Sequence, residues 1–452
     1  MNTLQEQIVR YVTLVVCCLV IFSCSDDEHV DVTPEITEGI PSITYYTPTE
    51  GGKSTVLSLY GSHFGTDISR IRVTVNGVLA EVTNTTGNLI TARIAEGSGS
   101  GEVKVIVGEG EEAVEFTYGN GFNYKTRMMV ATYLGVPGDE AVGGKEDGSF
   151  EEASFTKPRY LLWNRNGGLY IIEEGNSSAT GYSSIRYASG NQVSTLLKGS
   201  QSSLVQRIRA VALSGTEDSL FIANDTNAGG SMGVGIMTGS GGADFSGLTS
   251  LWDQSGITSV VSHPVTGEIF VGYHSDAWIY RYENGSFNPV VRLPADTEGT
   301  FSDKGNINSI VFDTSGTGVY IVSKAKNVIY KGNYDMLSGT FSGISILAGT
   351  YEQAGYADGM GTAASFDEPS QADLDREGNL YVADRKNHCI RKITPDGVVT
   401  TYAGKGGGLS GLVDGPIETA EFNHPEGLQF GLDGALYVAD YWNHRIRKIY
   451  EQ

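Results

Sequence analysis

Six residues in the C-terminal part of the chain are candidates for contact with a ligand, and four of them are aromatic. They are Tyr182, Tyr273, His274, Arg385, Tyr441 and Trp442. A flat aromatic face can pack against the C–H groups of a sugar ring, and planar polar groups can bind its hydroxyls. The alternative for the aromatic residues is structural, because such rings can also wedge between the units of a repeated fold.

Residues for catalysis or metal binding are not singled out by any motif. The chain has neither a His-Glu-x-x-His nor a Gly-x-Ser-x-Gly pattern, the marks of zinc proteases and of many serine hydrolases. His388 and His444 belong to a repeated motif and are expected to be structural, while His263 and His274 lie outside it. We therefore nominate no catalytic residue and no metal ligand. With 53 acidic residues in the chain, a carboxylate pair for glycoside cleavage stays open.

Calcium is the one cofactor that the sequence leaves open. Asp373, Asp375 and Glu377 have a spacing loosely similar to that of a calcium-binding loop. They lack the Gly and the terminal Glu of an EF-hand, so we expect these carboxylates to stabilise a turn instead.

The segment 126–452 is built from repeats. The run LYVAD at 380–384 recurs at 436–440, and each copy is followed by Asn-His and an Ile-Arg-Lys-Ile strand. Weaker copies of the strand begin at residues 169, 220, 269 and 319, which makes six units spaced by 49 to 61 residues. Units of this length with about four short strands each are typical of propeller blades. A six-bladed β-propeller is the predicted fold.

Closure of the ring supports this count. The sixth repeat stops after its third strand, and the missing fourth strand is found at the start of the segment, where ATYLG at 131–135 matches TTYAG at 400–404. We predict that residues 129–134 form the outer strand of the last blade. Such closure leaves no exposed sheet edge at the seam.

Residues 41–125 predict a small immunoglobulin-like β-sandwich. Five runs of alternating apolar and polar residues, from TVLSLYG to AVEFTYG, are separated by turn signals at intervals of about 10–15 residues. Asn76-Gly77 between two such runs is typical of a tight hairpin turn.

Both segments resemble known families. LYGSHFG at 59–65 and VTVNG at 73–77 are similar to the IPT/TIG family, in which the module is usually a spacer or interaction domain. FNHPEGL at 422–428 and FDEP at 366–369 resemble the inner-strand opening of the NHL-repeat family. The resemblance implies an IPT/TIG domain at 41–125 followed by an NHL-type propeller at 126–452. Related six-bladed propellers include metal-dependent lactonases and zinc-containing lyases.

Residues 1–23 are expected to be a lipoprotein signal peptide. The apolar run at 11–22 is too short to span a membrane but fits the core of a signal peptide. Cys24 resembles the lipid-bearing Cys of bacterial lipoproteins, and the acidic run that follows resembles a Bacteroidetes surface-export signal. Residues 24–40 are predicted to be a flexible acidic tether. The alternative is an ordinary secretory peptide. If instead Cys17 and Cys18 leave with a lipoprotein signal peptide and Cys24 carries lipid, Cys389 is the sole free thiol, and we expect it to be a buried packing residue.

The net charge of -22 argues against nucleic acid as a partner, because a polyanion repels phosphate groups. It also argues against contact with anionic lipid, so membrane attachment is expected through the lipid anchor alone. The domain pair behind a lipoprotein signal resembles Bacteroidetes cell-surface proteins that are often encoded with glycan-uptake systems. The resemblance implies an outer-membrane location facing the exterior, with outer-membrane uptake proteins as candidate partners.

The loops give the first functional hypothesis. Connections at 135–154, 349–365 and 404–421 share one propeller face with the loops that carry the six candidate residues. Long loops on a rigid scaffold are a natural binding surface. We expect a non-enzymatic surface protein that binds a polysaccharide or glycoconjugate there. The alternatives are a metal-dependent propeller enzyme, either a lactonase or a polysaccharide-cleaving enzyme, and a protein-binding adhesion or scaffold lipoprotein.

Overall fold

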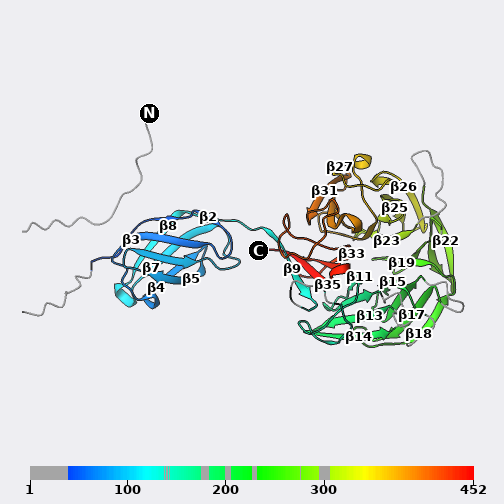
Figure 1. Cartoon of the computed structure of the whole chain (residues 1–452), viewed down its shortest axis with the longest axis horizontal. Coiled ribbons are helices and arrows are strands. Elements are labelled where there is room, and N and C mark those ends of the chain that lie inside the picture. Colours follow the sequence, from blue (N-terminus) through cyan, green and yellow to red (C-terminus); the bar gives the residue numbers. More distant parts are fainter. Residues whose placement is uncertain are drawn as a thin grey trace, which may run out of the picture.

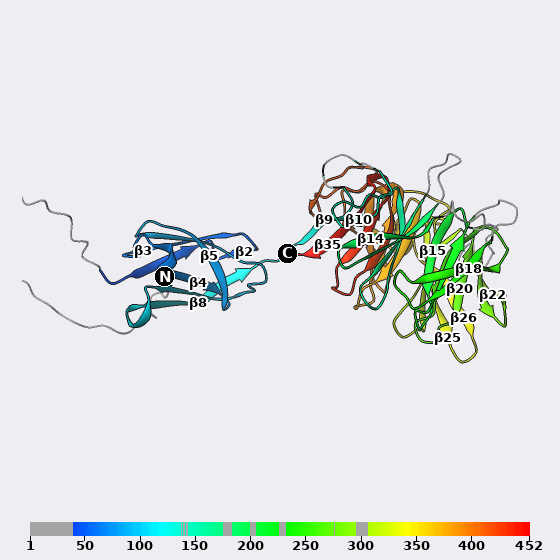
Figure 2. The same cartoon turned by 90° about the horizontal axis from the view of Figure 1, so that it is seen from below.

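The computed structural model describes residues 39–136, 138, 141, 143–174, 183–198, 205–225, 232–274, 276–294 and 306–452. They form an N-terminal sandwich and a C-terminal propeller, both made of β-strands with short 3₁₀ turns (Figures 1 and 2). The predicted all-β fold is confirmed. The predicted signal peptide, Cys24, most of the tether and Tyr182 lie outside the described residues.

The sandwich has one hydrophobic core, which includes Leu57, Val73, Ile90, Val105 and Phe122. The Asn76-Gly77 hairpin is present, with φ of 50° and 79° at its two turn residues. The structure adds three strands, β1, β2 and β5, to the five that the alternation predicts. The strands are β1 (Ser42–Thr47), β2 (Glu50–Gly51), β3 (Val56–Ser62), β4 (Ile71–Val75), β5 (Val78–Thr85), β6 (Leu89–Arg93), β7 (Gly101–Val107) and β8 (Val114–Tyr124).

Six antiparallel sheets form the propeller blades. The first three are β11 (Pro158–Trp163), β12 (Leu169–Glu173), β13 (Ser184–Ser189) and β14 (Gln192–Lys198), with β10 (Gly148–Ser149) at the edge; β15 (Ile208–Leu213), β16 (Ser219–Asn224), β17 (Val234–Gly239) and β18 (Phe245–Trp252); and β19 (Ile257–Ser262), β20 (Ile269–Tyr273), β21 (Trp278–Glu283) and β22 (Ser286–Arg292). The predicted second strands begin within one residue of the observed ones in all six blades.

The last three blades follow the same order. They are β23 (Ile307–Phe312), β24 (Gly318–Ser323), β25 (Val328–Asp335) and β26 (Thr340–Ala348); β28 (Pro369–Leu374), β29 (Leu380–Asp384), β30 (Cys389–Ile393) and β31 (Val398–Ala403), with β27 (Gly359–Met360) at the edge; and β33 (Pro425–Phe430), β34 (Leu436–Asp440), β35 (Arg445–Glu451) and β9 (Met128–Leu134), with β32 (Gly415–Pro416) at the edge. In Figure 1 the first strands lie round the centre of the disc and the fourth strands lie toward its rim.

Hydrophobic clusters join each blade to the next. Six clusters of buried residues each draw side chains from two adjacent blades. In the cluster between the fifth and sixth blades, Tyr381 and Ile390 pack with Phe422, Leu428 and Val438. Because the apolar residues are used between blades, the axis is left to other side chains.

A buried ion pair repeats in three blades. In the fifth blade, Arg391 NH1 donates to Asp384 at 2.8 Å, and its guanidinium carbon lies 5.1 Å from the ring centroid of Phe366. Arg447, Asp440 and Phe422 repeat this unit in the sixth blade, and Arg186, Glu173 and Phe155 in the first. Asp384 and Asp440 are therefore structural. Cys389 is fully buried beside this unit, and burial raises the pKa of its thiol.

The N-terminal strand β9 closes the ring as predicted. It pairs with β35 from Met128 opposite Glu451 to Leu134 opposite Ile446. Just before β9, Arg127 and Gln452 exchange two backbone hydrogen bonds of 3.0 and 2.9 Å. No helix among the described residues has the length and apolar character needed to cross a membrane.

Replacing Val130 of β9 by proline is expected to open this seam. Val130 pairs with both β35 and β32 and is buried, and proline within a sheet removes a ladder hydrogen bond. We expect a loss of about 3 kcal/mol in the free energy of unfolding, measured by chemical denaturation. Val130→Ala, which removes only side-chain packing, is the control. Equal losses for both variants would contradict a role for the β9 backbone in closure.

Candidate functional site

One polar residue per blade is displaced from the regular pairing at the start of the inner strand. In every blade the register between the first and second strands shifts at this point. A bulged residue is left out of the ladder, so its side chain can be aimed elsewhere. These residues, here called the inner ring, are Arg159, Arg209, Thr258, Asn308, Ser370 and Glu426.

A second residue per blade directly follows the second strand. The second strand runs antiparallel to the first, so its end lies beside the start of the inner strand and both sets lie on one face. This is the face of the long fourth-to-first connections. These residues, here called the outer ring, are Glu174, Asp225, His274, Lys324, Arg385 and Tyr441.

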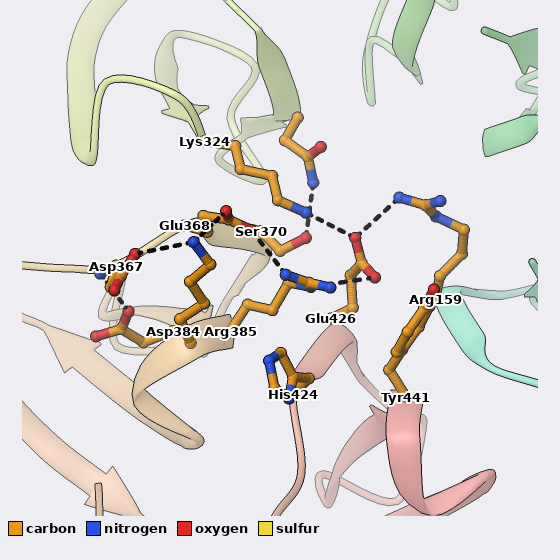
Figure 3. A network of polar contacts seen from close by, with 12 residues as sticks. Arg159, Lys324, Asp367, Glu368, Ser370, Asp384, Arg385, His424, Glu426 and Tyr441 are labelled. Atoms are coloured by element: carbon orange, nitrogen blue, oxygen red, sulfur yellow. Dashed lines mark hydrogen bonds and ion pairs between the residues drawn. The ribbon is translucent and has the colours of Figure 1, made fainter. Parts of the chain in front are cut away.

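Glu426 is the centre of the charged network that joins the two rings (Figure 3). Its carboxylate accepts from Arg159 NH2 and from Lys324 Nζ, each at 2.8 Å, and Arg385 Nε lies 3.6 Å away. Its side chain is 3% exposed. Three cations from three other blades therefore converge on one desolvated carboxylate.

The positive charges decide the ionisation of Glu426. Burial alone would raise its pKa, but Arg159, Lys324 and Arg385 outweigh burial and lower the pKa to about 2. Burial lowers the pKa of Lys324, against the opposing effect of Glu426. Glu426 is thus held as an anion, which suits it to fixing cations and makes it a poor proton donor.

The network continues round the axis through two further carboxylates. Glu174 accepts from Arg159 NH1 at 3.1 Å and from the Tyr441 hydroxyl at 2.6 Å. Arg209 lies 3.6 Å from Glu174 and donates to Asp225 at 2.8 Å. On the other side, Asn308 and Ser370 of the inner ring are joined by a hydrogen bond of 2.7 Å.

Gln371 forms a polar crossing at the same inner strands. Its amide exchanges two hydrogen bonds with the backbone of Leu161, at 3.0 and 2.8 Å, reaching from β28 to β11. The route passes Gly427 of β33, where a Cβ would lie 2.8 Å from Arg159 O and 3.0 Å from Gln371 Oε1. A side chain at Gly427 would therefore disturb this crossing.

A cavity of about 250 Å³ is formed by both rings. It is lined by Arg159, Arg207, Arg209, Asp225, Ser255, Gly256, Thr258, Tyr273, His274, Asn306, Asn308 and Lys324. The lining residues come from the first four blades and the connections before them, and nearly all are polar.

Tyr273 and His274, two of the predicted site residues, line this cavity. The Tyr273 hydroxyl accepts from Gln254 Nε2 at 2.9 Å. Arg385, Tyr441 and Trp442 are not among its lining residues. Tyr182 lies outside the described residues.

Arg385 and Tyr441 belong to the charged network. Arg385 NH1 donates to Glu368 at 2.7 Å, and its guanidinium carbon lies 5.5 Å from the Tyr441 ring centroid. Tyr441 is 5% exposed, as the structural alternative predicts, whereas Trp442 is 39% exposed. Lys157 Nζ lies 4.2 Å from the Trp442 ring centroid. Trp442 is thus the more exposed aromatic residue of this pair, and a cation lies over its ring.

The repeat histidines are structural. His388 Nδ1 accepts from the His424 backbone N–H, and His444 Nδ1 from that of Lys157, both at 3.0 Å. Burial is the main cause that lowers the pKa of His424 to about 4. His263 is also buried, and its Nε2 lies 2.8 Å from Gly316 O.

Across the described part of the chain, no group of three or more His, Cys, Asp or Glu is arranged to hold a metal ion. Of the carboxylates with calcium-like spacing, Asp375 accepts from the backbone of Glu377 and Asn379, and Asp373 from that of Phe430. Asp375 therefore stabilises a turn, as expected, whereas Asp373 lies in β28 and joins it to β33 of the next blade.

Sequence reasoning missed the two cations and the one carboxylate of the inner ring. Arg159, Glu426 and Ser370 each follow a proline at the start of an inner strand, in Lys157-Pro158, His424-Pro425 and Glu368-Pro369. Aligning these openings would have placed the three residues in register. Aligning the residue after each second strand would have added Lys324 to His274, Arg385 and Tyr441.

The fold and the site define a two-domain protein with an IPT/TIG sandwich and a propeller that contains NHL repeats. Residues 41–124 match the IPT/TIG domain model, and residues 366–393 and 422–449 match the NHL repeat model. The chain spans 27% and 13% of the length of the first two curated relatives it matches.

Solved structures of similar architecture come from Bacteroides. An auxiliary nutrient binding protein from Bacteroides ovatus is 26% identical, with a TM-score of 0.75, over 93% of this chain and 100% of that one. An auxiliary nutrient binding protein from Bacteroides thetaiotaomicron is 28% identical, with a TM-score of 0.68, over 91% and 98%. A third, named "Putative phosphatase", from the same species, is 26% identical, with a TM-score of 0.66, over 92% and 98%.

Replacing Glu426 by Gln is expected to cost about 3 kcal/mol of folding stability, because it leaves Arg159 and Lys324 buried without their shared partner. Chemical denaturation at pH 7 measures the loss. Glu418→Gln, at an exposed position, is the matched control. A loss no larger than that of the control would show that the network does not depend on Glu426.

The lowered pKa of Glu426 also predicts that the effect of Glu426→Gln on stability depends on pH. The pKa of Glu426 falls from an ordinary 4.5 to about 2 on folding, so its contribution to stability is complete above pH 4.5 and is lost as the pH falls toward 2. The difference in unfolding free energy between the natural chain and Glu426→Gln should therefore shrink between pH 5 and pH 3. A constant difference over this range would contradict the lowered pKa.

Proposed function

We propose that this protein is a non-enzymatic binding protein that holds a polysaccharide or glycoconjugate on the long-loop face of its propeller. The observation that carries the proposal is a cavity on that face to which both polar rings contribute, the inner ring with four residues and the outer ring with three. The binding role is also the role named for two similar Bacteroides proteins. Ligand pockets with convergent polar groups on a rigid scaffold are typical binding sites.

The chemistry of the site favours binding over acid–base catalysis. Glu426, Glu174 and Asp225 all pair with arginine or lysine. A glycosidase of the usual kind needs one carboxyl group that keeps its proton near neutral pH, and the cations round Glu426 have the opposite effect. Trp442, at the edge of the site, offers an exposed ring for a sugar face.

Placement at the cell surface is part of the proposal. A lipid on Cys24 would anchor the chain in the outer membrane, facing the exterior, with residues 24–40 as a tether. The sandwich would then hold the propeller away from the membrane, where outer-membrane uptake proteins could receive the ligand. The Bacteroides origin of the similar proteins supports this location.

A second candidate is an enzyme that acts on a phosphate ester. The name of the third similar structure and the cationic cavity favour it over the other enzyme alternatives. Release of phosphate from a phosphorylated glycan would assign the protein to that class. Saturable capture of an outer-membrane protein without any glycan binding would instead assign it to the adhesion class.

Trp442→Ala is expected to weaken glycan binding by about tenfold or more, because a stacked aromatic ring contributes roughly 1–2 kcal/mol. A glycan array, with and without calcium, would identify the ligand for residues 39–452, which include both domain cores. Isothermal titration would then measure the variant. The control, Leu432→Ala, removes an apolar side chain that is more exposed than Trp442, at 63%, from the turn between β33 and β34 on the opposite face. Equal effects of both variants would reject the site.

A further inference from the structure

The cavity is positively charged in a chain that is strongly negative. Four of its lining side chains are cations, Arg159, Arg207, Arg209 and Lys324, and one, Asp225, is a carboxylate. The chain as a whole carries a net charge of -22. A concave site of one sign with low-dielectric walls concentrates the field and attracts ligands of the opposite sign. The positive charge of the cavity is therefore opposite in sign to the net charge of the chain.

The neighbouring carboxylates do not cancel this charge. Glu174, Asp225 and Glu426 are shared among the four lining cations, Arg159, Arg207, Arg209 and Lys324, which makes three anions for four cations. Arg385 also contacts Glu426, but it has a carboxylate partner of its own in Glu368. Lys324 is among the buried cations, with a side chain 14% exposed. Burying a cation without a full counter-charge costs free energy, and the binding of an anion would offset that cost.

The structural arginines elsewhere in the propeller differ from those of the cavity in the hydrogen-bond partners of their guanidinium groups. Arg391 binds two carboxylates, Asp384 and Asp358, and two backbone carbonyl oxygens, so its guanidinium is saturated apart from Nε. Arg447 has the same set of partners in the sixth blade. Arg207 is unlike them, because the described residues give it one partner, Asp225 at 3.5 Å, and it is 52% exposed.

The cationic groups are held in place before any ligand arrives. Asp225 fixes Arg209 through Nε at 2.9 Å and NH2 at 2.8 Å, and Glu426 fixes Arg159 at 2.8 Å. Arg209 and Arg159 are 11% and 6% exposed. Guanidinium groups ordered in this way recognise carboxylate and phosphate oxygens with little loss of side-chain entropy.

The rest of the lining suits a sugar that carries such a group. Ser255, Thr258, Asn306, Asn308 and His274 bring hydroxyl, amide and imidazole groups to the same cavity. Hydroxyl and amide groups can both donate to and accept from sugar hydroxyls. A cavity of about 250 Å³ holds a group of roughly monosaccharide size rather than a long chain segment.

We infer that the axial cavity binds an anionic group of the ligand, the carboxylate of an acidic sugar or a phosphate, through Arg207, Arg209, Arg159 and Lys324. This inference rests on the proposed glycan-binding function and names the class of glycan.

A matched pair of probes tests the inference. Hexagalacturonate and its methyl ester have the same sugar backbone, but the ester has lost its negative charges. Isothermal titration with residues 39–452 is expected to give an affinity for the acid at least about tenfold higher than for the ester, and the difference should shrink as salt is raised. Inorganic phosphate, titrated alone and as a competitor, distinguishes a free or esterified phosphate from an acidic sugar.

Arg207→Gln is the principal variant, because Arg207 is half-exposed and its loss should leave the fold intact. It is expected to weaken binding of the acid by about five- to tenfold, the effect of one charge-assisted hydrogen bond, and to leave the ester unchanged. Arg165→Gln removes the same charge from a side chain 70% exposed at the opposite end of β11, and should change affinity less than about twofold. Lys324→Met, checked for folding by thermal denaturation, is the second variant.

The outcomes separate the inference from the function on which it rests. Binding of phosphate but not of hexagalacturonate, lost in Arg207→Gln, supports the anion site and assigns it to a phosphorylated ligand. Equal affinity for acid and ester, equal effects of Arg207→Gln and Arg165→Gln, or no binding of any acidic probe overturns it. Binding of a neutral glycan that depends on Trp442, but on neither Arg207 nor Arg165, would support the proposed function and reject the anion site.

Discussion

The organisation of the candidate site depends on the desolvated carboxylate of Glu426. Three cations that would repel one another in a buried setting, Arg159, Lys324 and Arg385, are held close because they share it. The carboxylate in turn keeps its charge only because those cations surround it. This mutual dependence gives the axis a fixed arrangement of charges, which a set of independent surface ion pairs would not provide.

The propeller separates its apolar and polar chemistry by position. Apolar side chains fill the six spaces between blades, and Phe, Arg and Asp or Glu brace three of the blades from within. The bulges at the start of the inner strands then free one residue per blade from the ladder. A rigid frame therefore carries six exchangeable positions round the axis, and ligand chemistry can vary there without changes to the packing between blades.

Much of the fold could be predicted from the sequence, because the repeated apolar strand and the displaced fourth strand have local sequence patterns. The site could be predicted only in part. His274, Arg385 and Tyr441 follow recognisable strands, so their common face could be predicted. Arg159 and Glu426 could have been placed in register by their Pro-containing strand openings, but their ion pair, which joins residues 267 apart, has no local signal in the sequence. A bulge also breaks the alternation by which inward-facing and outward-facing residues are distinguished.

The closing strand has a mechanical consequence. The covalent path from the sandwich to the propeller runs through Arg127 directly into β9, the strand that completes the sixth blade. Tension between a held ligand and the N-terminal domain therefore enters the propeller at β9, where the pairing with β35 and the two Arg127–Gln452 hydrogen bonds share it with the backbone that continues to the first blade. Flow or traction on a bound polymer would strain the ring at its own seam first, before the load reached the blades that carry the cavity.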